Sequence, residues 1–220
     1  TTTPLVKGNN TKDYGAQVIL HGEVFDDAAE LAARMAEEQG LTYVHPFNDL
    51  TLATGQGTIA YEIFQDLPDV DVILVPIGGG GLAAGVATLA IVTLPSATTI
   101  ADGVAVKTPG DKVFPYIQQN VDRILTIDDG ELVEAFLDVM ERHKMVVENA
   151  GLLTVAALRH LDCKEKNVVS VLSGGNMDVI TVASLVQHGL INRGRVFTFS
   201  VQLPDRPGEL LRVAQLVAEA

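Results

Sequence analysis

The sequence predicts an α/β fold in which an open, mostly parallel twisted sheet carries helices on both faces. Residues 70–77 (VDVILVPI) and 167–173 (NVVSVLS) are rich in Val, Ile and Leu, which is typical of strands buried on both faces. Helical patterns occupy residues 129–145 and 150–161 between them. Strands that alternate with helices of this length form βαβ units, so we expect neighbouring strands to run parallel.

The other expected elements continue this alternation: strands at residues 16–22 and 41–47, and helices at residues 25–40, 55–67 and 179–190. The helix at 25–40 has the clearest limits, because Asp26 and Asp27 near its start complement the helix dipole and Gly40 is a typical stop signal. The pattern then changes near the end of the chain. Residues 196–203 alternate like a half-exposed antiparallel strand, and a Pro-Gly turn after them leads into a helix, so a second domain is expected there.

Composition and charge exclude several classes of partner. The chain has 28 acidic and 15 basic residues, a formal net charge of −13, and no cluster of Lys or Arg that could neutralise phosphates. We therefore expect no binding to nucleic acid or to anionic membrane surfaces. The single cysteine, Cys163, excludes an internal disulfide framework and suits a reducing compartment, so we expect a cytoplasmic protein. The first residues show neither a signal-peptide pattern nor an initiator Met, which indicates a fragment.

One uncharged stretch, from Val72 to Ala101, is long enough for a membrane helix. Pro76 and the four glycines that follow it interrupt this stretch near its start, and Pro95 interrupts it again. Because proline and glycine break a continuous helix, we expect no membrane insertion.

Two glycine clusters follow the two buried strands. Gly78–Gly81 come after residues 70–77, and Ser173-Gly174-Gly175-Asn176 come after the strand at 167–173. In open parallel sheets, ligands bind beyond the carboxyl ends of the strands. Glycines between a buried strand and a helix let backbone N–H groups converge on an anion, and the helix N-terminus adds partial positive charge. The pattern therefore predicts a phosphate site that needs no lysine.

Alternatives to this phosphate site are weaker but remain open. A flexible linker is disfavoured, because the glycines lie between buried apolar segments. A Walker A motif requires Gly-Lys-Ser/Thr, which is absent. A dinucleotide fingerprint would place its third glycine at Ala83 or Ala84, and because alanine is allowed there, a dinucleotide-binding oxidoreductase stays a rival hypothesis.

Other chemistry-bearing residues give less specific signals. The histidines are scattered without metal-ligand spacing, so we expect them in surface or core roles and expect no metal site. Asp102 and Glu148 lie next to apolar runs and glycines, where each could be a helix cap or a pocket group. Ser173 alone would also suit a helix cap. Cys163 has no base beside it in the sequence and is expected to be inert.

Five motifs taken together resemble one family: HPFNDLTLATGQGTIAYEI (45–63), VPIGGGGLAAG (75–85), TIADGVAVK (99–107), ERHKMVVENAG (141–151) and VLSGGNMD (171–178). In this order they are similar to the pyridoxal-phosphate-dependent threonine dehydratases and serine racemases, which have fold type II, a tryptophan-synthase-β-like fold. The resemblance spans residues 1 to about 192. A further motif, VQLPDRPGEL (201–210), looks like the start of an α+β ACT domain, an amino-acid-binding regulatory module, which favours a dehydratase over a racemase.

The resemblance implies a division into domains. Residues 1–45 would be part of the small domain, residues 46–192 the large pyridoxal-phosphate-binding domain, and residues 196–220 the beginning of an ACT-like module starting near Val196. Family members have a further strand and helix where Val92 is followed directly by Thr93 here, so a gap is expected at 92/93. The resemblance also implies a homodimer or homotetramer.

The family's functional residues carry over to positions of this chain. The implied cofactor-binding residues are Gly78, Gly79, Gly80, Gly81 and Leu82 around the phosphate, Ser173 at the pyridine nitrogen, and Gly103 and Glu148 beside the ring. Asp205, Arg206, Pro207 and Gly208 match the ligand loop of an ACT module and would bind an amino-acid effector. The family reaction converts L-threonine to 2-oxobutanoate and ammonia, with L-serine giving pyruvate as a secondary reaction.

The catalytic residue of the family has no counterpart in this chain. The Schiff-base lysine and the Ser-Gly-Asn-His loop lie upstream of the matched region, and none of the seven lysines has the expected context (Lys7, Lys12, Lys107, Lys112, Lys144, Lys164 and Lys166). The acids that bind a cation in some relatives fall in the gap, so no metal ligand is assigned. Three interpretations stay open. The chain could belong to a threonine ammonia-lyase that has further segments outside these 220 residues, to a serine racemase or serine dehydratase of the same fold, or to a non-catalytic fragment. The sequence does not separate a biosynthetic role toward isoleucine from a degradative one.

Overall fold

The computed structural model describes residues 5–84 and 98–219. The chain divides into two compact units, Thr1–Gly189 and Leu190–Ala220. The expected gap at 92/93 lies outside the described residues, as does most of the small-residue stretch after the four glycines. The domain limits expected from the sequence therefore stay predictions.

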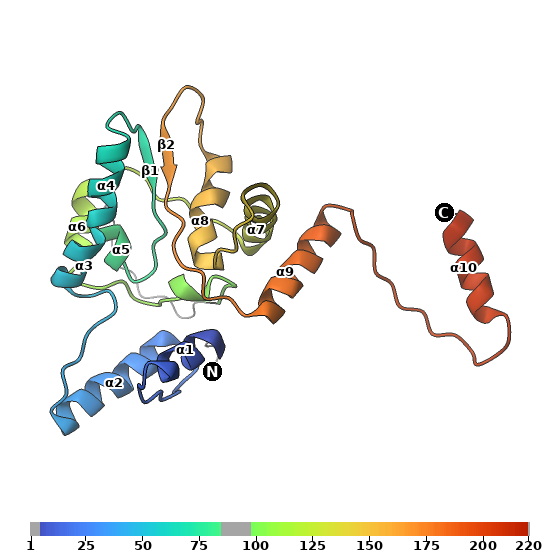
Figure 1. Cartoon of the computed structure of the whole chain (residues 1–220), viewed down its shortest axis with the longest axis horizontal. Helices are drawn as coiled ribbons and strands as arrows, with labels where there is room; N and C mark the ends of the chain where they lie inside the picture. The colour runs from blue at the N-terminus through green and yellow to red at the C-terminus, as the bar shows by residue number, and fades with distance from the viewer. Residues whose placement is uncertain (1–4, 85–97, 220) are drawn as a thin grey trace. The chain divides into compact units, whose positions relative to one another are not determined.

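Two parallel strands form the centre of the first unit. β1 (Val72–Leu74) pairs with β2 (Val168–Ser170) in the register Val72 to Val168, and Figure 1 shows them side by side. The pairing continues beyond β2, where the Val171 amide donates to the Leu74 carbonyl at 3.0 Å. Both strands lie within the runs predicted from the sequence, and their parallel direction confirms the βαβ prediction. Their carboxyl ends therefore meet at one edge of the sheet.

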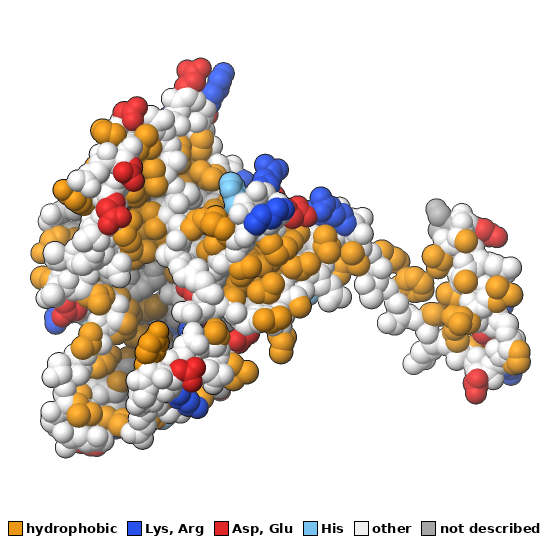
Figure 2. Space-filling view, in the orientation of Figure 1, with side chains coloured by type: hydrophobic (Ala, Val, Ile, Leu, Met, Phe, Trp, Pro, Cys, Tyr) orange, Lys and Arg blue, Asp and Glu red, His pale blue; other side chains and the backbone are white. Residues whose placement is uncertain are grey.

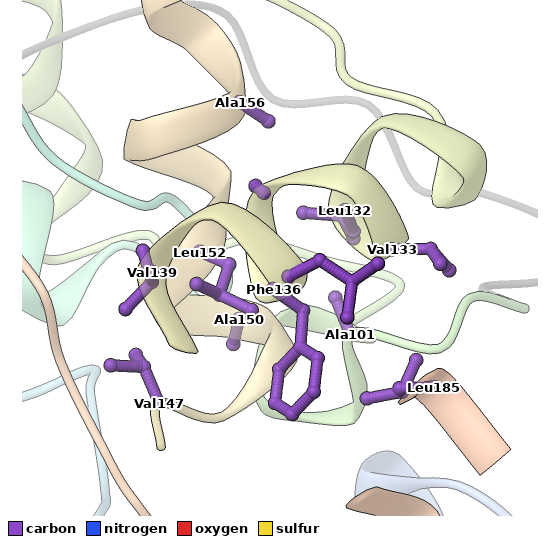
Figure 3. Close-up of a cluster of buried hydrophobic side chains, with 12 residues drawn as sticks. Ala101, Leu132, Val133, Phe136, Val139, Val147, Ala150, Leu152, Ala156 and Leu185 are labelled. Atoms are coloured by element: carbon purple, nitrogen blue, oxygen red, sulfur yellow. The ribbon is translucent and has the colours of Figure 1, made fainter. Parts of the chain in front are cut away.

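Helices α7 (Asp129–His143) and α8 (Asn149–Ala157) pack together over the main hydrophobic core. Figure 3 shows Leu132 and Phe136 of α7 facing Ala150 and Leu152 of α8, with Leu185 beside them. Leu152 is fully buried. The α7 start is fixed by a capping box, in which Asp128 accepts from the amide of the third helical residue and that residue's carboxylate accepts from the Asp128 amide. This packing holds the start of α8 in place at the sheet edge.

A second, smaller core lies under the first glycine cluster. It brings together residues of α3 (Leu50–Gln56), α5 (Gly81–Ala84) and α6 (Phe114–Asn120), with Val113 just before α6. Ile117 and Val113 are buried there, and both lie close to Gly80. The sequence predicts one helix over 55–67; the structure instead has α3 and then α4 (Thr58–Asp66), because Gly57 separates the two.

The N-terminal part of the first unit consists of two helices. α1 (Leu5–Asp13) is absent from the sequence prediction, whereas α2 (Phe25–Gln39) confirms it, with Gly40 in the left-handed conformation as its C-cap. The α1 helix is capped from a distance: the Leu5 and Val6 amides donate to the Asp178 carboxylate at 3.0 and 3.1 Å. Short 3-10 turns complete the unit at Asp102–Val104 and Leu158–His160.

The second unit begins within the last turn of α9 (Val179–Asn192) and ends with α10 (Glu209–Glu219). Both helices were expected. The segment between them has no strand, although it exposes alternate large side chains such as Phe197 and Phe199, and Figure 2 shows hydrophobic side chains along this part of the chain. Strand formation requires a hydrogen-bonding neighbour, and none is present for this segment among the described residues.

Two further strand predictions are wrong because a pairing strand is missing among the described residues. Residues 16–22 and 41–47 were expected as strands, but neither segment pairs with another strand in the part of the chain that the structure describes. Across residues 5–84 and 98–219, no helix combines the length and the apolar character needed to cross a membrane.

Candidate functional site

All eight residues that the sequence assigns to the cofactor line one cavity of about 900 Å³ in the first unit. They come from four segments of the chain: the loop after β1, the 3-10 turn at Asp102–Val104, the position just before α8, and the loop after β2 (Gly78, Gly79, Gly80, Gly81, Leu82, Gly103, Glu148 and Ser173). The volume falls in the usual range of small-molecule and cofactor sites. The parallel sheet explains the convergence, because the carboxyl ends of β1 and β2 meet at the same edge.

The first glycine cluster leaves no room for side chains. A Cβ on Gly78 would lie 2.9 Å from Val104 Cα, and one on Gly80 would lie 2.7 Å from Ile117 Cδ1. Gly80 also has a φ of +97°, which side-chain-bearing residues rarely adopt. A Cβ on Gly81 would lie 2.8 Å from Phe47 Cα. Glycine at these positions is therefore required by close packing of the loop as well as by backbone conformation.

The amide groups of this loop are free to bind an anion. Within the described residues, none of the five N–H groups from Gly78 to Leu82 donates a hydrogen bond to the protein. The Gly79 carbonyl, in contrast, accepts from the Gly110 amide at 2.9 Å, which fixes the loop from its other side. Unpaired backbone N–H groups beside a cavity need an acceptor, and a phosphate supplies several.

The second glycine cluster lies against Glu148. The Glu148 amide donates to the Gly174 carbonyl at 3.2 Å, and Gly174, with a φ of +82°, packs directly on the Glu148 side chain. Ser173 is half-buried, and its hydroxyl makes no hydrogen bond to the residues that the structure describes. The Glu148 carboxylate also approaches Gly103, where a Cβ would lie 3.1 Å from its Oε1 atom. Ser173, Glu148 and Gly103 thus form one side of the cavity.

Helix α1 contributes a residue that the sequence analysis did not assign to the cavity. Lys7 lines the cavity, and its Nζ atom lies 3.1 Å from the Asp102 carboxylate, next to Gly103. Both side chains are partly exposed. No local pattern around Lys7 indicates this role, because its partner Asp102 is 95 residues away in the chain.

A turn at residues 45–48 also contributes to the cavity. The Phe47 ring lies against Gly79, and Phe47 and Phe25 both line the cavity. The Asn48 side chain connects this turn to the next loop, since its amide donates to Asp111 at 2.7 Å and its Oδ1 accepts from the Lys112 amide at 2.9 Å. The Asn48 hydrogen bond holds the pKa of Asp111 below its ordinary value. From the sequence, residues 45–48 are predicted to matter only as part of the motif HPFNDLTLATGQGTIAYEI that carries the family resemblance.

The expected effector residues belong to the second unit. Asp205, Arg206, Pro207 and Gly208 are exposed in the turn that precedes α10, where Gly208 has a φ of +95° and its carbonyl accepts from the Arg212 amide. No His, Cys, Asp or Glu residues of the described ranges group into a metal site.

Comparisons with known proteins identify the family of this chain. The chain matches the family described as "Pyridoxal-phosphate dependent enzyme" over residues 1–91 and 88–174. It is 42% identical to an L-threonine ammonia-lyase of Geobacter sulfurreducens over 249 residues, covering 100% of this chain and 62% of that protein.

Solved structures show the same fold. The processed form of threonine deaminase isoform 2 from Solanum lycopersicum has a TM-score of 0.74 and 29% identity, covering 85% of this chain and 64% of that one. Maize serine racemase has a TM-score of 0.72 and 28% identity, covering 88% and 69%. The chain spans about three fifths of the curated relative's length, 62%. With the family matched over most of its length, the chain belongs to the pyridoxal-phosphate-dependent enzymes.

Proposed function

We propose that this chain is part of a threonine ammonia-lyase, a lyase that converts L-threonine to 2-oxobutanoate and ammonia and L-serine to pyruvate. The observation that carries the proposal is the convergence of Gly78–Leu82, Gly103, Glu148 and Ser173 on one cavity of about 900 Å³. The identity of 42% to an L-threonine ammonia-lyase supports this substrate class.

The residues present fit pyridoxal phosphate. The residues Gly78 to Leu82 all line the cavity, and their free N–H groups would hold the phosphate without a lysine. When bound, pyridoxal phosphate supplies a ring that withdraws electrons from the reacting carbon of an amino acid. The free hydroxyl of Ser173 would hydrogen-bond the ring nitrogen, and Gly103 and Glu148 would lie beside the ring.

Ser173 also bears on the type of reaction. A neutral hydroxyl, unlike a carboxylate, does not favour a proton on the nitrogen that it contacts, because it offers no negative charge. The ring is then a weaker electron acceptor, which favours rapid loss of a β-hydroxyl over chemistry that needs a long-lived carbanion. Ser173 therefore supports elimination from L-threonine or L-serine.

Two other interpretations have specific support. The likeness to maize serine racemase keeps a serine racemase or serine dehydratase as an alternative, although the identity there is 28% against 42% for the ammonia-lyase. A non-catalytic fragment is supported by the lysines: within the described ranges, Lys7 is the lysine that lines the cavity, and Asp102 pairs with it at 3.1 Å. The Lys7 side chain is thus already engaged by a carboxylate of the cavity wall.

The alignments support a gap within the chain. The match to the Geobacter protein extends over 249 residues, against 220 in this chain, and the family matches in two stretches that meet at residues 88–91. Missing residues at 92/93 would explain both observations. We therefore infer that the active enzyme contains segments beyond these 220 residues, the Schiff-base lysine among them.

The remaining parts of the proposal rest on the sequence resemblance. Residues 1–45 would belong to the small domain and residues 46–192 to the large domain, with an ACT-like module from residue 196 that binds an amino-acid effector at Asp205–Gly208 and makes the enzyme allosteric. The exposed turn before α10 agrees with such a loop. We further propose that the enzyme is a homodimer or homotetramer in the cytoplasm. Its role would lie in amino-acid metabolism, including isoleucine biosynthesis.

The proposal is tested by adding pyridoxal phosphate to the full-length natural protein and to this chain, and by assaying 2-oxobutanoate release from L-threonine. We expect binding by both proteins, but Schiff-base absorbance and turnover by the full-length protein alone. Racemisation of L-serine without ammonia release would favour the racemase. A full-length protein that binds no pyridoxal phosphate would contradict the proposal.

A further inference from the structure

The turn at residues 45–48 is organised around one imidazole nitrogen. Nδ1 of His45 accepts from the Asn48 amide at 2.9 Å and lies 3.3 Å from the Phe47 amide, which also donates to it. A nitrogen that accepts from N–H groups carries no proton, so His45 is neutral and bears its hydrogen on Nε2. This arrangement imitates the turn that an Asn or Asp side chain forms with the backbone two or three residues later.

Aromatic side chains hold His45 in this orientation. Its ring centroid lies 4.6 Å from that of Phe47 at an interplanar angle of 83°, and 5.7 Å from that of Tyr43 at 65°. Phe25 at the start of α2 completes the group, 5.2 Å from Phe47 and 6.3 Å from His45. The edge-to-face contacts of His45 with Tyr43, Phe47 and Phe25 fix the orientation of its ring.

The same turn supports the glycine loop. The Phe47 ring covers Gly79, and the Phe47 backbone lies against Gly81, where a Cβ would be 2.9 Å from Phe47 Cβ and 3.0 Å from Phe47 O. Asn48 packs on Gly110, whose amide holds the Gly79 carbonyl. Movement of the turn would therefore release the loop on two sides.

We propose that neutral His45 is a positioning residue for the phosphate cradle: its Nδ1 atom fixes the turn that holds Phe47 against Gly79 and Gly81. This inference rests on the proposed binding of pyridoxal phosphate to Gly78–Leu82. His45 itself does not line the cavity and acts through its neighbours in the turn, Phe47 and Asn48.

Protonation of His45 would undo this arrangement, because Nδ1 would become a donor facing two other donors. Burial keeps the pKa of His45 below its ordinary value, and the positive charge of Lys112 lowers it further, whereas Asp49 and Asp111 act in the opposite direction. Tyr43, a further titratable neighbour, is neutral at and below neutral pH, since burial raises its pKa. The neutral form is thus present at neutral pH, and the turn loosens as the pH falls through the lowered pKa of His45.

The test compares pyridoxal phosphate affinity of the full chain, measured by equilibrium dialysis between about pH 5.5 and 8, in the wild type and two variants. In His45→Asn, Oδ1 replaces the Nδ1 acceptor but does not titrate; we expect wild-type affinity at the upper pH and a smaller loss at the lower pH. In His45→Leu the acceptor is absent, and we expect affinity about ten-fold weaker than that of the wild type at the upper pH, with a smaller difference at the lower pH. His143→Asn, which changes an exposed histidine outside the cavity, is the matched control and should follow the wild type.

The phosphate group of pyridoxal phosphate also titrates in this pH range. The decisive quantity is therefore the difference in the pH dependence of affinity between the wild type and His45→Asn. Parallel pH profiles for these two proteins would overturn the inference and leave the proposed function intact. Absence of pyridoxal phosphate binding by the wild type at every pH would instead remove the proposed function. Nitrogen chemical shifts of His45 provide a second measurement that needs no ligand: Nδ1 should be unprotonated at neutral pH, and a protonated Nδ1 would refute the role. If His45→Leu does not fold, His45→Asn and the chemical shifts still decide.

Discussion

Replacing Gly79 by alanine tests whether Phe47 and the glycine loop form one packed unit. The added Cβ would lie 2.5 Å from Phe47 Cδ1, with two further ring carbons equally near. Carbon atoms in protein interiors normally stay about 3.5–4.0 Å apart, so the ring or the loop would have to move by about 1 Å. Gly79 does not have a positive φ, and backbone strain adds nothing to the effect. The cost is therefore purely steric.

The size of this steric cost follows from the usual cost of overpacking a protein core. We expect Gly79→Ala to lower the free energy of unfolding by about 2 kcal/mol, within the usual range of about 1–3 kcal/mol. In a Phe47→Ala background the ring is gone and most of this penalty should disappear, which gives a coupling energy of about 1–2 kcal/mol between the two positions. Urea unfolding, monitored by circular dichroism, measures the free energy of unfolding of the wild type, the two single variants and the double variant.

Gly55→Ala is the matched control. Gly55 lies within α3 and a Cβ there would meet no atom within 4 Å. We expect alanine at this position to stabilise the protein by about 0.5–1 kcal/mol, because it reduces the freedom of the unfolded chain and favours the helix. The reasoning fails if Gly79→Ala behaves like Gly55→Ala, or if the effects of Gly79→Ala and Phe47→Ala simply add within about 0.5 kcal/mol.

Three further changes test the core, the site and an acid-sensitive cap. Leu152→Ala should cost about 2–5 kcal/mol in urea unfolding, since Leu152 is fully buried; a loss below about 1 kcal/mol would contradict its place in the core. Ser173→Ala should weaken pyridoxal phosphate binding about five-fold in equilibrium dialysis without changing the melting temperature, and an unchanged dissociation constant would remove Ser173 from the site. The Asp27 carboxylate accepts from the Glu23 and Val24 amides, which lower its pKa, so its contribution to stability is present above its ordinary pKa and disappears as the pH falls through the lowered value. Thermal melts of wild type and Asp27→Asn should therefore differ at neutral pH and converge as the pH falls through the lowered pKa of Asp27, and a difference independent of pH would refute this assignment.

The elements that the sequence predicts well are those whose signals are local. α2 has acidic residues at its start and Gly40 at its end, and α7 begins at a capping box, so their limits follow from short-range hydrogen bonds. α1 has no comparable signal. Its residues form no apolar stripe, and the carboxylate that caps it, Asp178, lies 173 residues away from Leu5. A helix fixed by a distant residue leaves little trace in its own sequence.

Strand predictions succeed or fail by the same criterion. The runs that contain β1 and β2 are rich in Val, Ile and Leu, and each strand has the other as its hydrogen-bonding neighbour. Residues 16–22 and 41–47 have a similar local pattern, but no described strand pairs with them. The pattern records which side chains suit a strand, whereas the pairing partner is decided elsewhere in the chain.

The site separates into a part that a sequence can predict and a part that it cannot. Two glycine clusters after two buried strands predict a shared site, because the carboxyl ends of parallel strands meet at one edge. The contact between Phe47 and Gly79 follows no such rule, since an aromatic residue after a proline has no preferred partner 32 positions away. His45 is an intermediate case. A histidine two and three residues before amides that need an acceptor could indicate a side-chain turn, but only the structure shows that this turn supports the glycine loop. If the His45→Asn profile departs from that of the wild type as expected, the motif HPFND describes a support for the phosphate site as well as a family resemblance.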